Sequence, residues 1–118
     1  MALKTVKEVL ENVHKSSGSR CFLYFVASPD ETGESWCPDC RKAQKPVEEA
    51  VKQLPQNSVF LTIHTGNRKE WKDQNNAFRL EPLLNVSKVP TLMEFGKTKR
   101  LVESQLFSTD TILKYFNH

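Results

Sequence analysis

The feature that most constrains this chain is a pair of cysteines two residues apart, in the segment WCPDC at residues 36–40. The pair follows an apolar run, residues 21–27, which has the composition of a short strand covered on both faces. A helix is predicted to begin at Pro38, because a proline at the first helical position loses no hydrogen bond. A buried strand and a helix start are therefore expected to position both thiols.

The position of the two thiols indicates redox chemistry. A thiol at a helix N-terminus meets unpaired backbone N–H groups and the positive end of the helix dipole, and both favour its thiolate. Cys37 lies nearer the helix end, so we expect it to be the exposed nucleophile. Cys40 lies one turn further in, where it can close a disulfide and resolve a mixed disulfide formed at Cys37.

Other interpretations of the cysteine pair stay open at this point. Two cysteines at this spacing are also half of a zinc site, but completing it would need Cys21 and a histidine, and no histidine is suitably paired. A purely structural pair is a further alternative, disfavoured by the place of both cysteines at a surface helix start, and a thiol pair kept only as a docking surface is another. Cys21 itself opens the apolar run, so we expect a buried core thiol there in preference to a third redox centre.

Hydrophobic periodicity along the chain predicts alternating helices and strands. The predicted strands are residues 21–27, 59–64, 91–95 and 100–104, and the predicted helices begin near residues 6, 38, 77 and 109. Residues 65–76 are polar and turn-rich around Trp71, which is predicted to shape the surface near the cysteine pair. The order of elements predicts an α/β fold in which a mixed sheet lies between helices.

Composition excludes several classes of protein. The 17 basic and 14 acidic residues are mixed along the chain and give a net charge of +3, and the basic clusters lack interleaved aromatics, so nucleic-acid binding is not indicated. No apolar run approaches the roughly 18 residues of a membrane helix, and the N-terminus has no apolar signal segment. Three cysteines are no disulfide scaffold, so we expect one cytoplasmic domain over residues 1–118.

Several segments together resemble thioredoxin-fold proteins. They are the WCPDC segment, the downstream Pro46, Val89-Pro90-Thr91 and the final hairpin and helix, in the same order. Residues 71–79 and 101–104 extend the resemblance, over nearly the whole chain, to the family of cytosolic 14-kDa thioredoxin-related proteins. The resemblance implies a thioredoxin-like fold with a central mixed sheet of four to five strands, flanked by helices, whose first strand is short or absent.

The resemblance also implies a function. It points to a disulfide reductase that acts on selected proteins and on small disulfides such as cystine, with Cys37 and Cys40 as its redox pair. No bound cofactor is implied, because thioredoxin reductase would recharge the protein at the expense of NADPH. The implied partners are that reductase and disulfide substrates such as a dynein light chain, and we expect a monomer. The competing interpretation is a redox-sensitive adaptor that binds a signalling partner through the cysteine face with little turnover.

The resemblance assigns roles to further residues by their position. Pro38 and Asp39 would tune the redox potential. Trp36, Val89 and Pro90 would dock the substrate, and Pro90 matches the family's cis-proline, whose preceding residue offers backbone hydrogen bonds to an extended substrate. No residue is assigned to a metal.

Two positions depart from the thioredoxin pattern. Tyr24 stands where thioredoxins carry a buried aspartate, so we expect Tyr24 in the core and look elsewhere for the base that takes the proton from Cys40. Asp39 is the nearest carboxylate in sequence. Pro46 follows Cys40 by six residues where the family spacing is five, which predicts either a π-bulge or a proline on a shifted helix face.

Overall fold

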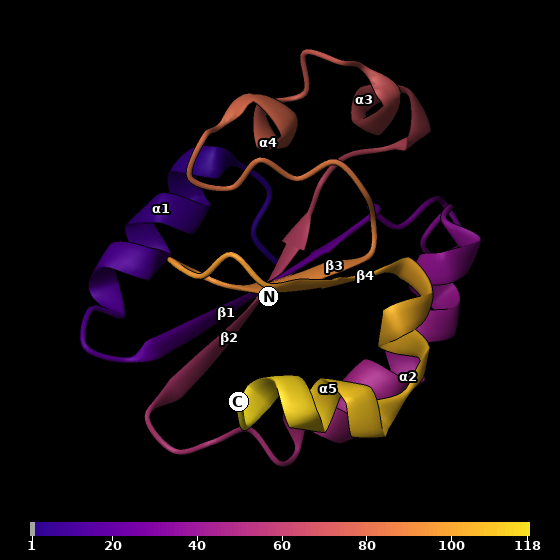
Figure 1. The fold of residues 1–118 in the computed structure, drawn as a ribbon. Coiled ribbons are helices and arrows are strands. Elements are labelled where there is room, and N and C mark those ends of the chain that lie inside the picture. The colour runs from indigo at the N-terminus through magenta and orange to yellow at the C-terminus, as the bar shows by residue number, and fades with distance from the viewer. Residues whose placement is uncertain (1) are drawn as a thin grey trace.

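The protein has a central sheet of four strands covered by helices on both faces (Figure 1). The computed structural model describes residues 2–118. The strands are β1 (Arg20–Val26), β2 (Ser58–His64), β3 (Thr91–Glu94) and β4 (Arg100–Val102). The helices are α1 (Val6–Lys15), α2 (Pro38–Val51), α3 (Arg68–Lys72), α4 (Ala77–Leu80) and α5 (Thr109–Phe116), with a short 3₁₀ helix η1 (Glu103–Phe107) before α5.

The sheet is mixed and has the strand order β2-β1-β3-β4. Strand β1 runs parallel to β2 and antiparallel to β3, and β3 is antiparallel to β4. Ahead of α1 the chain makes one parallel bridge to β2, in which the Leu3 N–H donates to Thr62 O at 2.9 Å and the His64 N–H donates to Leu3 O at 2.8 Å. The prediction of a short or absent first strand is therefore confirmed, as is the mixed sheet.

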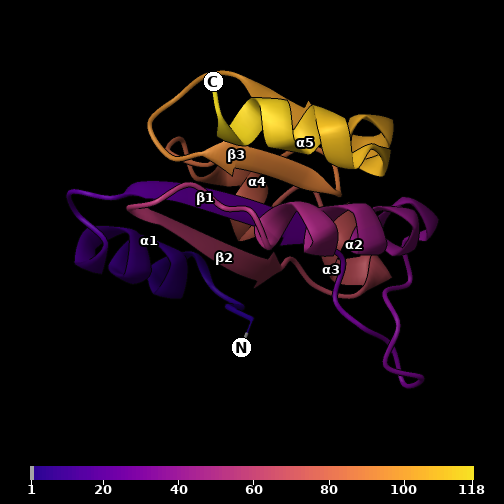
Figure 2. The ribbon, with the colours of Figure 1, turned by 90° about the horizontal axis from the view of Figure 1, so that it is seen from below.

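Strand β1 divides the interior into two cores because its side chains alternate between the faces of the sheet. Leu23 and Phe25 pack with residues of α1, α3 and α4 on one face. Phe22 packs on the other face, beneath α2 and α5, with its ring centroid 4.8 Å from that of Phe116. Figure 2 shows this second face from below, with α2 and α5 in front of the sheet. Burying each large apolar side chain contributes about 1.5–3 kcal/mol.

Helix α2 presents one buried stripe to the sheet, formed by Cys40, Ala43, Val47 and Ala50. The stripe follows helical spacing, so the packing that holds α2 on the sheet also encloses the second thiol. The helix is α-helical throughout Pro38–Val51, so the π-bulge alternative is wrong and Pro46 lies on a shifted, half-buried face. There the Pro46 carbonyl accepts a hydrogen bond from Thr109 Oγ1 at 3.1 Å, which ties the start of α5 to α2.

The segment of residues 65–76, predicted to be turn-rich, also contains helix α3, which the sequence pattern did not predict. Asn67 caps this helix and Glu70 completes a capping box, which pairs backbone donors that would otherwise stay free. The helix turns Trp71 inward, where its side chain is 4% exposed and belongs to the core, so Trp71 does not shape the surface. The Arg79 guanidinium covers the indole at 3.9 Å from the ring centroid.

The two strands of the final hairpin are shorter than predicted. The predicted segments 91–95 and 100–104 correspond to β3 and β4, and β4 ends at Val102. Glu103 then adopts a positive φ of 50° and the chain turns into η1, so pairing cannot continue. The helix near residue 109 forms as predicted.

A partly buried ion pair joins the start of β1 and the end of β3 to the last helix. Arg20 donates two hydrogen bonds to the Glu94 carboxylate, at 3.1 and 2.9 Å, and a third to the Phe116 carbonyl at 2.8 Å. The hydrogen bonds from Arg20 are the main cause of a lowered pKa at Glu94, whose ordinary value is 4.5. This carboxylate therefore stabilises the fold in its ionised form.

Replacing Glu94 with Gln should lower the free energy of unfolding at neutral pH by about 1–2 kcal/mol, because Arg20 then meets a neutral acceptor. Since the pKa of Glu94 is lower in the folded state, its contribution is present above the ordinary value of 4.5 and is lost as the pH falls through the folded value. Urea unfolding at neutral and acid pH measures this difference. Glu49→Gln, which removes an exposed pair with Lys52, serves as the control and should change stability by less than about 0.5 kcal/mol. A Glu94→Gln deficit that persists undiminished in acid would contradict this account.

Candidate active site

Cys37 occupies the N-cap of α2, directly ahead of Pro38. Its backbone is extended, and its Sγ accepts a hydrogen bond from the backbone N–H of Cys40 at 3.3 Å. An N-cap acceptor satisfies one of the free donors at a helix start, so the sulfur stands in the place where a helix favours negative charge. The helix begins at the predicted residue, and it brings the two cysteines together as predicted. The expectation of an exposed Cys37 is wrong, because its side chain packs into the core and only 7% of the residue is exposed.

The loop before β3 contacts the same sulfur. The Cys37 thiol lies 3.7 Å from the carbonyl oxygen of Val89, to which it donates. The peptide bond between Val89 and Pro90 is cis, as the resemblance predicted. Val89 and Pro90 are thus placed beside Cys37, and their role in docking a substrate stays a prediction.

Cys40 is enclosed, with only 3% of its surface exposed. Burial raises the pKa of its thiol from 9.0 to about 12, while hydrogen bonding by the Ala27 backbone and by the Ser35 side chain acts in the opposite direction. Cys40 is therefore a neutral thiol at neutral pH, with two donors in place for its thiolate. Burial also raises the pKa of Cys21, which lies in the core as predicted. All three cysteines are free thiols.

The Trp36 side chain, directly ahead of Cys37 in the chain, is held in place by two contacts. Its indole Nε1 donates to the carbonyl of Gly66 at 3.1 Å, and the Arg68 guanidinium lies 4.9 Å from the ring centroid. On the other side of the loop, Arg41 donates to the Ser35 carbonyl at 2.6 Å. These contacts fix the residues that precede Cys37 against α2 and α3.

Pro38 is exposed and Asp39 is half-buried at the same helix start. Over residues 2–118 no hydrogen bond joins the Asp39 carboxylate to either thiol of the pair. The effect of Pro38 and Asp39 on the redox potential stays a prediction. In the described part of the chain, no group of three or more histidine, cysteine or acidic side chains is placed to hold a metal ion. Within that same part, no helix is long and apolar enough to cross a membrane.

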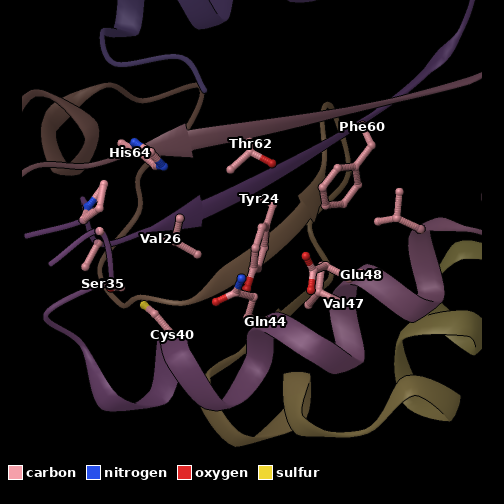
Figure 3. Close-up of a pocket in the computed structure, with 14 residues that line it drawn as sticks. Tyr24, Val26, Ser35, Cys40, Gln44, Val47, Glu48, Phe60, Thr62 and His64 are labelled. Carbon is pink, nitrogen blue, oxygen red and sulfur yellow. The ribbon is translucent and has the colours of Figure 1, made fainter. Parts of the chain in front are cut away.

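A cleft with a volume of about 520 Å³ lies behind the cysteine pair, between α2 and strands β1 and β2 (Figure 3). Cys40 lines it together with Tyr24, Gln44 and Glu48. Sequence reasoning placed Tyr24 in the core, where it lies, but missed Gln44 and Glu48. A signal was present, because Cys40, Gln44 and Glu48 are four residues apart and so share one face of a helix.

The four-stranded fold, with two neighbouring thiols at the start of α2, defines a thioredoxin-like protein. Residues 2–118 match the family described as "Thioredoxin domain-containing protein 17-like, thioredoxin domain", and the chain belongs to that family. The resemblance found from the sequence is thereby confirmed.

Relatives support the assignment over most of their length. The chain is 37% identical over 116 residues to Thioredoxin domain-containing protein 17 of Danio rerio, covering 98% of this chain and 93% of the relative. It is 38% identical over 105 residues to the protein of that name from Homo sapiens, covering 89% and 84%. The thioredoxin-like protein Clot of Arabidopsis thaliana is 27% identical over 95 residues, covering 77% and 71%.

Two solved structures share the fold. The germline-specific thioredoxin Deadhead of Drosophila melanogaster superposes with a TM-score of 0.61 at 15% identity, covering 99% of this chain and 96% of that one. Chloroplastic thioredoxin z superposes with a TM-score of 0.60 at 16% identity, covering 98% and 91%. At such low identity these likenesses show the fold alone, and the predicted thioredoxin-like fold is confirmed.

Alkylation at neutral pH should modify Cys37 before Cys40 or Cys21. Burial raises the pKa of Cys40 and of Cys21, so both stay protonated, whereas the Cys37 sulfur stands at the helix start. Timed iodoacetamide labelling followed by peptide mapping measures the order. In Cys37→Ser, the fast phase should disappear, and fast labelling of Cys40 or Cys21 in the unaltered protein would refute the assignment.

Proposed function

We propose that this protein is a thiol–disulfide oxidoreductase that reduces disulfides in selected proteins and in small molecules such as cystine. The observation that carries the proposal is the Cys37 sulfur at the N-cap of α2, 3.3 Å from the backbone N–H of Cys40. A sulfur held there is stabilised as the thiolate, which is the form that attacks a disulfide.

The reaction proceeds in two exchanges. The Cys37 thiolate attacks one sulfur of the substrate disulfide, a new S–S bond joins Cys37 to the substrate, and the other substrate sulfur leaves as a thiolate. Cys40 then loses its proton and attacks the Cys37 sulfur. The Cys37–Cys40 disulfide forms, the second substrate sulfur leaves with the electron pair, and the substrate has gained two electrons.

The substrate would dock across the surface around Cys37. The Val89 carbonyl lies 3.7 Å from the Cys37 sulfur, so a chain that runs beside Val89 and Pro90 brings its disulfide to the nucleophile. Backbone pairing with an extended segment is a common way to bind a peptide. The ring of Trp36, held by Gly66 and Arg68, would bound the site on the other side.

The oxidised pair has to be reduced again for turnover. We propose thioredoxin reductase as the electron donor, with NADPH consumed at that partner and no cofactor bound here. Disulfide proteins such as a dynein light chain would be substrates of a cytoplasmic, monomeric protein. Membership of the Thioredoxin domain-containing protein 17-like family supports these proposals.

Steady NADPH consumption is expected when the protein is mixed with thioredoxin reductase and cystine. Cys37→Ser should abolish it, and Cys40→Ser should stop after one mixed disulfide, because no resolving thiol remains. Cys21→Ala is the matched control and should keep turnover, because Cys21 lies near the start of β1, whereas the pair follows the other end of that strand. Reduction of only one equivalent of cystine by the unaltered protein would refute the enzyme and favour the redox-sensitive adaptor.

Asp39→Asn should make the protein less reducing, by about 30 mV, which corresponds to roughly 1.4 kcal/mol. The change removes a negative charge from the helix start and thereby stabilises the thiolate of the reduced form. Equilibration with a glutathione buffer measures the potential. Asp110→Asn removes an exposed carboxylate from the first turn of α5 and serves as the control. Equal potentials for Asp39→Asn and the unaltered protein would exclude redox tuning by Asp39.

A further inference from the structure

The hydroxyl of Tyr24 is enclosed without a hydrogen-bond partner in the described chain. Tyr24 is 6% exposed, and its hydroxyl oxygen is the buried side-chain polar atom that no group of residues 2–118 satisfies. A buried polar group left unpaired costs about 1–3 kcal/mol, so phenylalanine would be the more stable choice at this position. The hydroxyl faces the cleft that Cys40 also lines, which indicates a use there.

Figure 3 shows the Tyr24 side chain reaching from β1 toward α2, where Cys40, Gln44 and Glu48 follow one another along the helix. The row arises from the spacing of four residues, which places the three side chains on one face. Glu48 is exposed while Cys40 is buried, so the row leads from the enclosed thiol to solvent. With a volume of about 520 Å³, the cleft has room for water between these groups.

The titratable groups that face this cleft come from three elements: Tyr24 from β1, Cys40 and Glu48 from α2, and His64 from β2. Burial, and then the nearby charge of Cys40, raises the pKa of Tyr24, so the phenol keeps its proton and serves as a hydrogen-bond donor and acceptor. Burial lowers the pKa of His64, which is neutral at neutral pH. Glu48 is thus the carboxylate of the cleft.

In the second exchange, the Cys40 thiol has to lose its proton before or as it attacks the Cys37 sulfur. Cys40 is a neutral thiol with 3% of its surface exposed, and it has to attack the Cys37 sulfur, which carries the substrate at that stage. The Ala27 backbone and the Ser35 side chain can stabilise the Cys40 thiolate by hydrogen bonds, but neither takes up a proton. The cleft that Cys40 lines gives the proton a way out of the enclosed site.

We propose that Glu48 is the base of the resolving step, and that the Tyr24 hydroxyl, between the two groups, positions the waters through which the Cys40 proton reaches it. This inference rests on the proposed function. As the Cys40–Cys37 S–S bond forms and the Cys37–substrate S–S bond breaks, the Cys40 proton passes to the Glu48 carboxylate and the electron pair goes to the departing substrate sulfur. Tyr24 is a positioning residue in this scheme.

Asp39 is the competing base, since it adjoins Cys40 in sequence. Consecutive residues on an α-helix point about 100° apart, and Asp39 does not line the cleft that Cys40 faces. The negative charge of Asp39 at the helix start is placed to affect the redox potential. The geometry of the cleft favours Glu48 as the group that accepts the Cys40 proton.

The test is single-turnover reaction of the reduced protein with an excess of a chromogenic aryl disulfide. Attack by Cys37 releases a first coloured thiolate, and resolution by Cys40 releases a second, at a rate independent of reagent concentration. Tyr24→Phe and Glu48→Gln should each slow the second phase by about 10-fold or more and leave the first unchanged. The double variant should be no slower than the worse single one, because both act on one path. Glu49→Gln, an exposed carboxylate of the same helix paired with Lys52, is the control.

A chemical rescue separates proton transfer from a merely structural role. Added formate should restore the second phase of Glu48→Ala and should leave Glu49→Ala unaffected. An unchanged second phase in Tyr24→Phe and Glu48→Gln would overturn the proposal, and a phase slowed only by Asp39→Asn would assign the base to Asp39. Tyr24→Phe removes a hydroxyl that bonds to no group of residues 2–118, so its melting temperature should not fall and its first phase reports an intact site. Absence of both phases in the unaltered protein would overturn the proposed function and this path with it.

Discussion

The packing of α2 on the sheet is the contact on which the rest of the site depends. Its stripe of small and branched side chains, Ala43, Val47 and Ala50, lets the helix lie close to β1. Cys40 continues that stripe by one turn, and Cys37 stands just beyond it at the N-cap. One packing arrangement thus buries the second thiol and places the first at the positive end of the helix. This packing alone is enough to enclose Cys40 and to place Cys37 at the helix start, so that the two thiols differ in environment.

The inequality of the thiols sets the order of the chemistry. Burial raises the pKa of Cys40 to about 12, so this thiol does not compete with Cys37 for a substrate disulfide. Once Cys37 is bonded to substrate, the same burial becomes an obstacle, because Cys40 has to ionise. The donors from Ala27 and Ser35 lower that obstacle by stabilising the thiolate. The burial of Cys40 therefore ensures that Cys37 reacts first. It also means that the second exchange requires a group that removes the proton from Cys40.

Local sequence patterns predicted the elements that carry the cysteines, and nonlocal packing decided what they missed. The proline at the start of α2, the apolar run of β1 and the final helix each have a signal within a few residues. The inward turn of Trp71 does not, because it depends on α3 closing through Asn67 and Glu70 and on Arg79 covering the ring. The sequence did not predict the cleft for the same reason, because its lining comes from separate elements. The repeat of Cys40, Gln44 and Glu48 is visible in the sequence, but only the folded chain sets it opposite the hydroxyl of Tyr24.

Glu48 is exposed and lies two turns along the helix from the buried Cys40. A mutation at Glu48 can therefore change the reactivity of the thiol pair without changing folding stability, two properties that mutation usually alters together. A buried acid adjusts reactivity and folding stability at once, since altering it disturbs the interior. A carboxylate at the exposed edge of the cleft can be exchanged, moved by one turn or removed while the buried stripe of α2 stays packed. Substitutions at this edge of the cleft can therefore change how long a mixed disulfide persists without loss of the fold, which leaves the lifetime of a captured partner free to evolve.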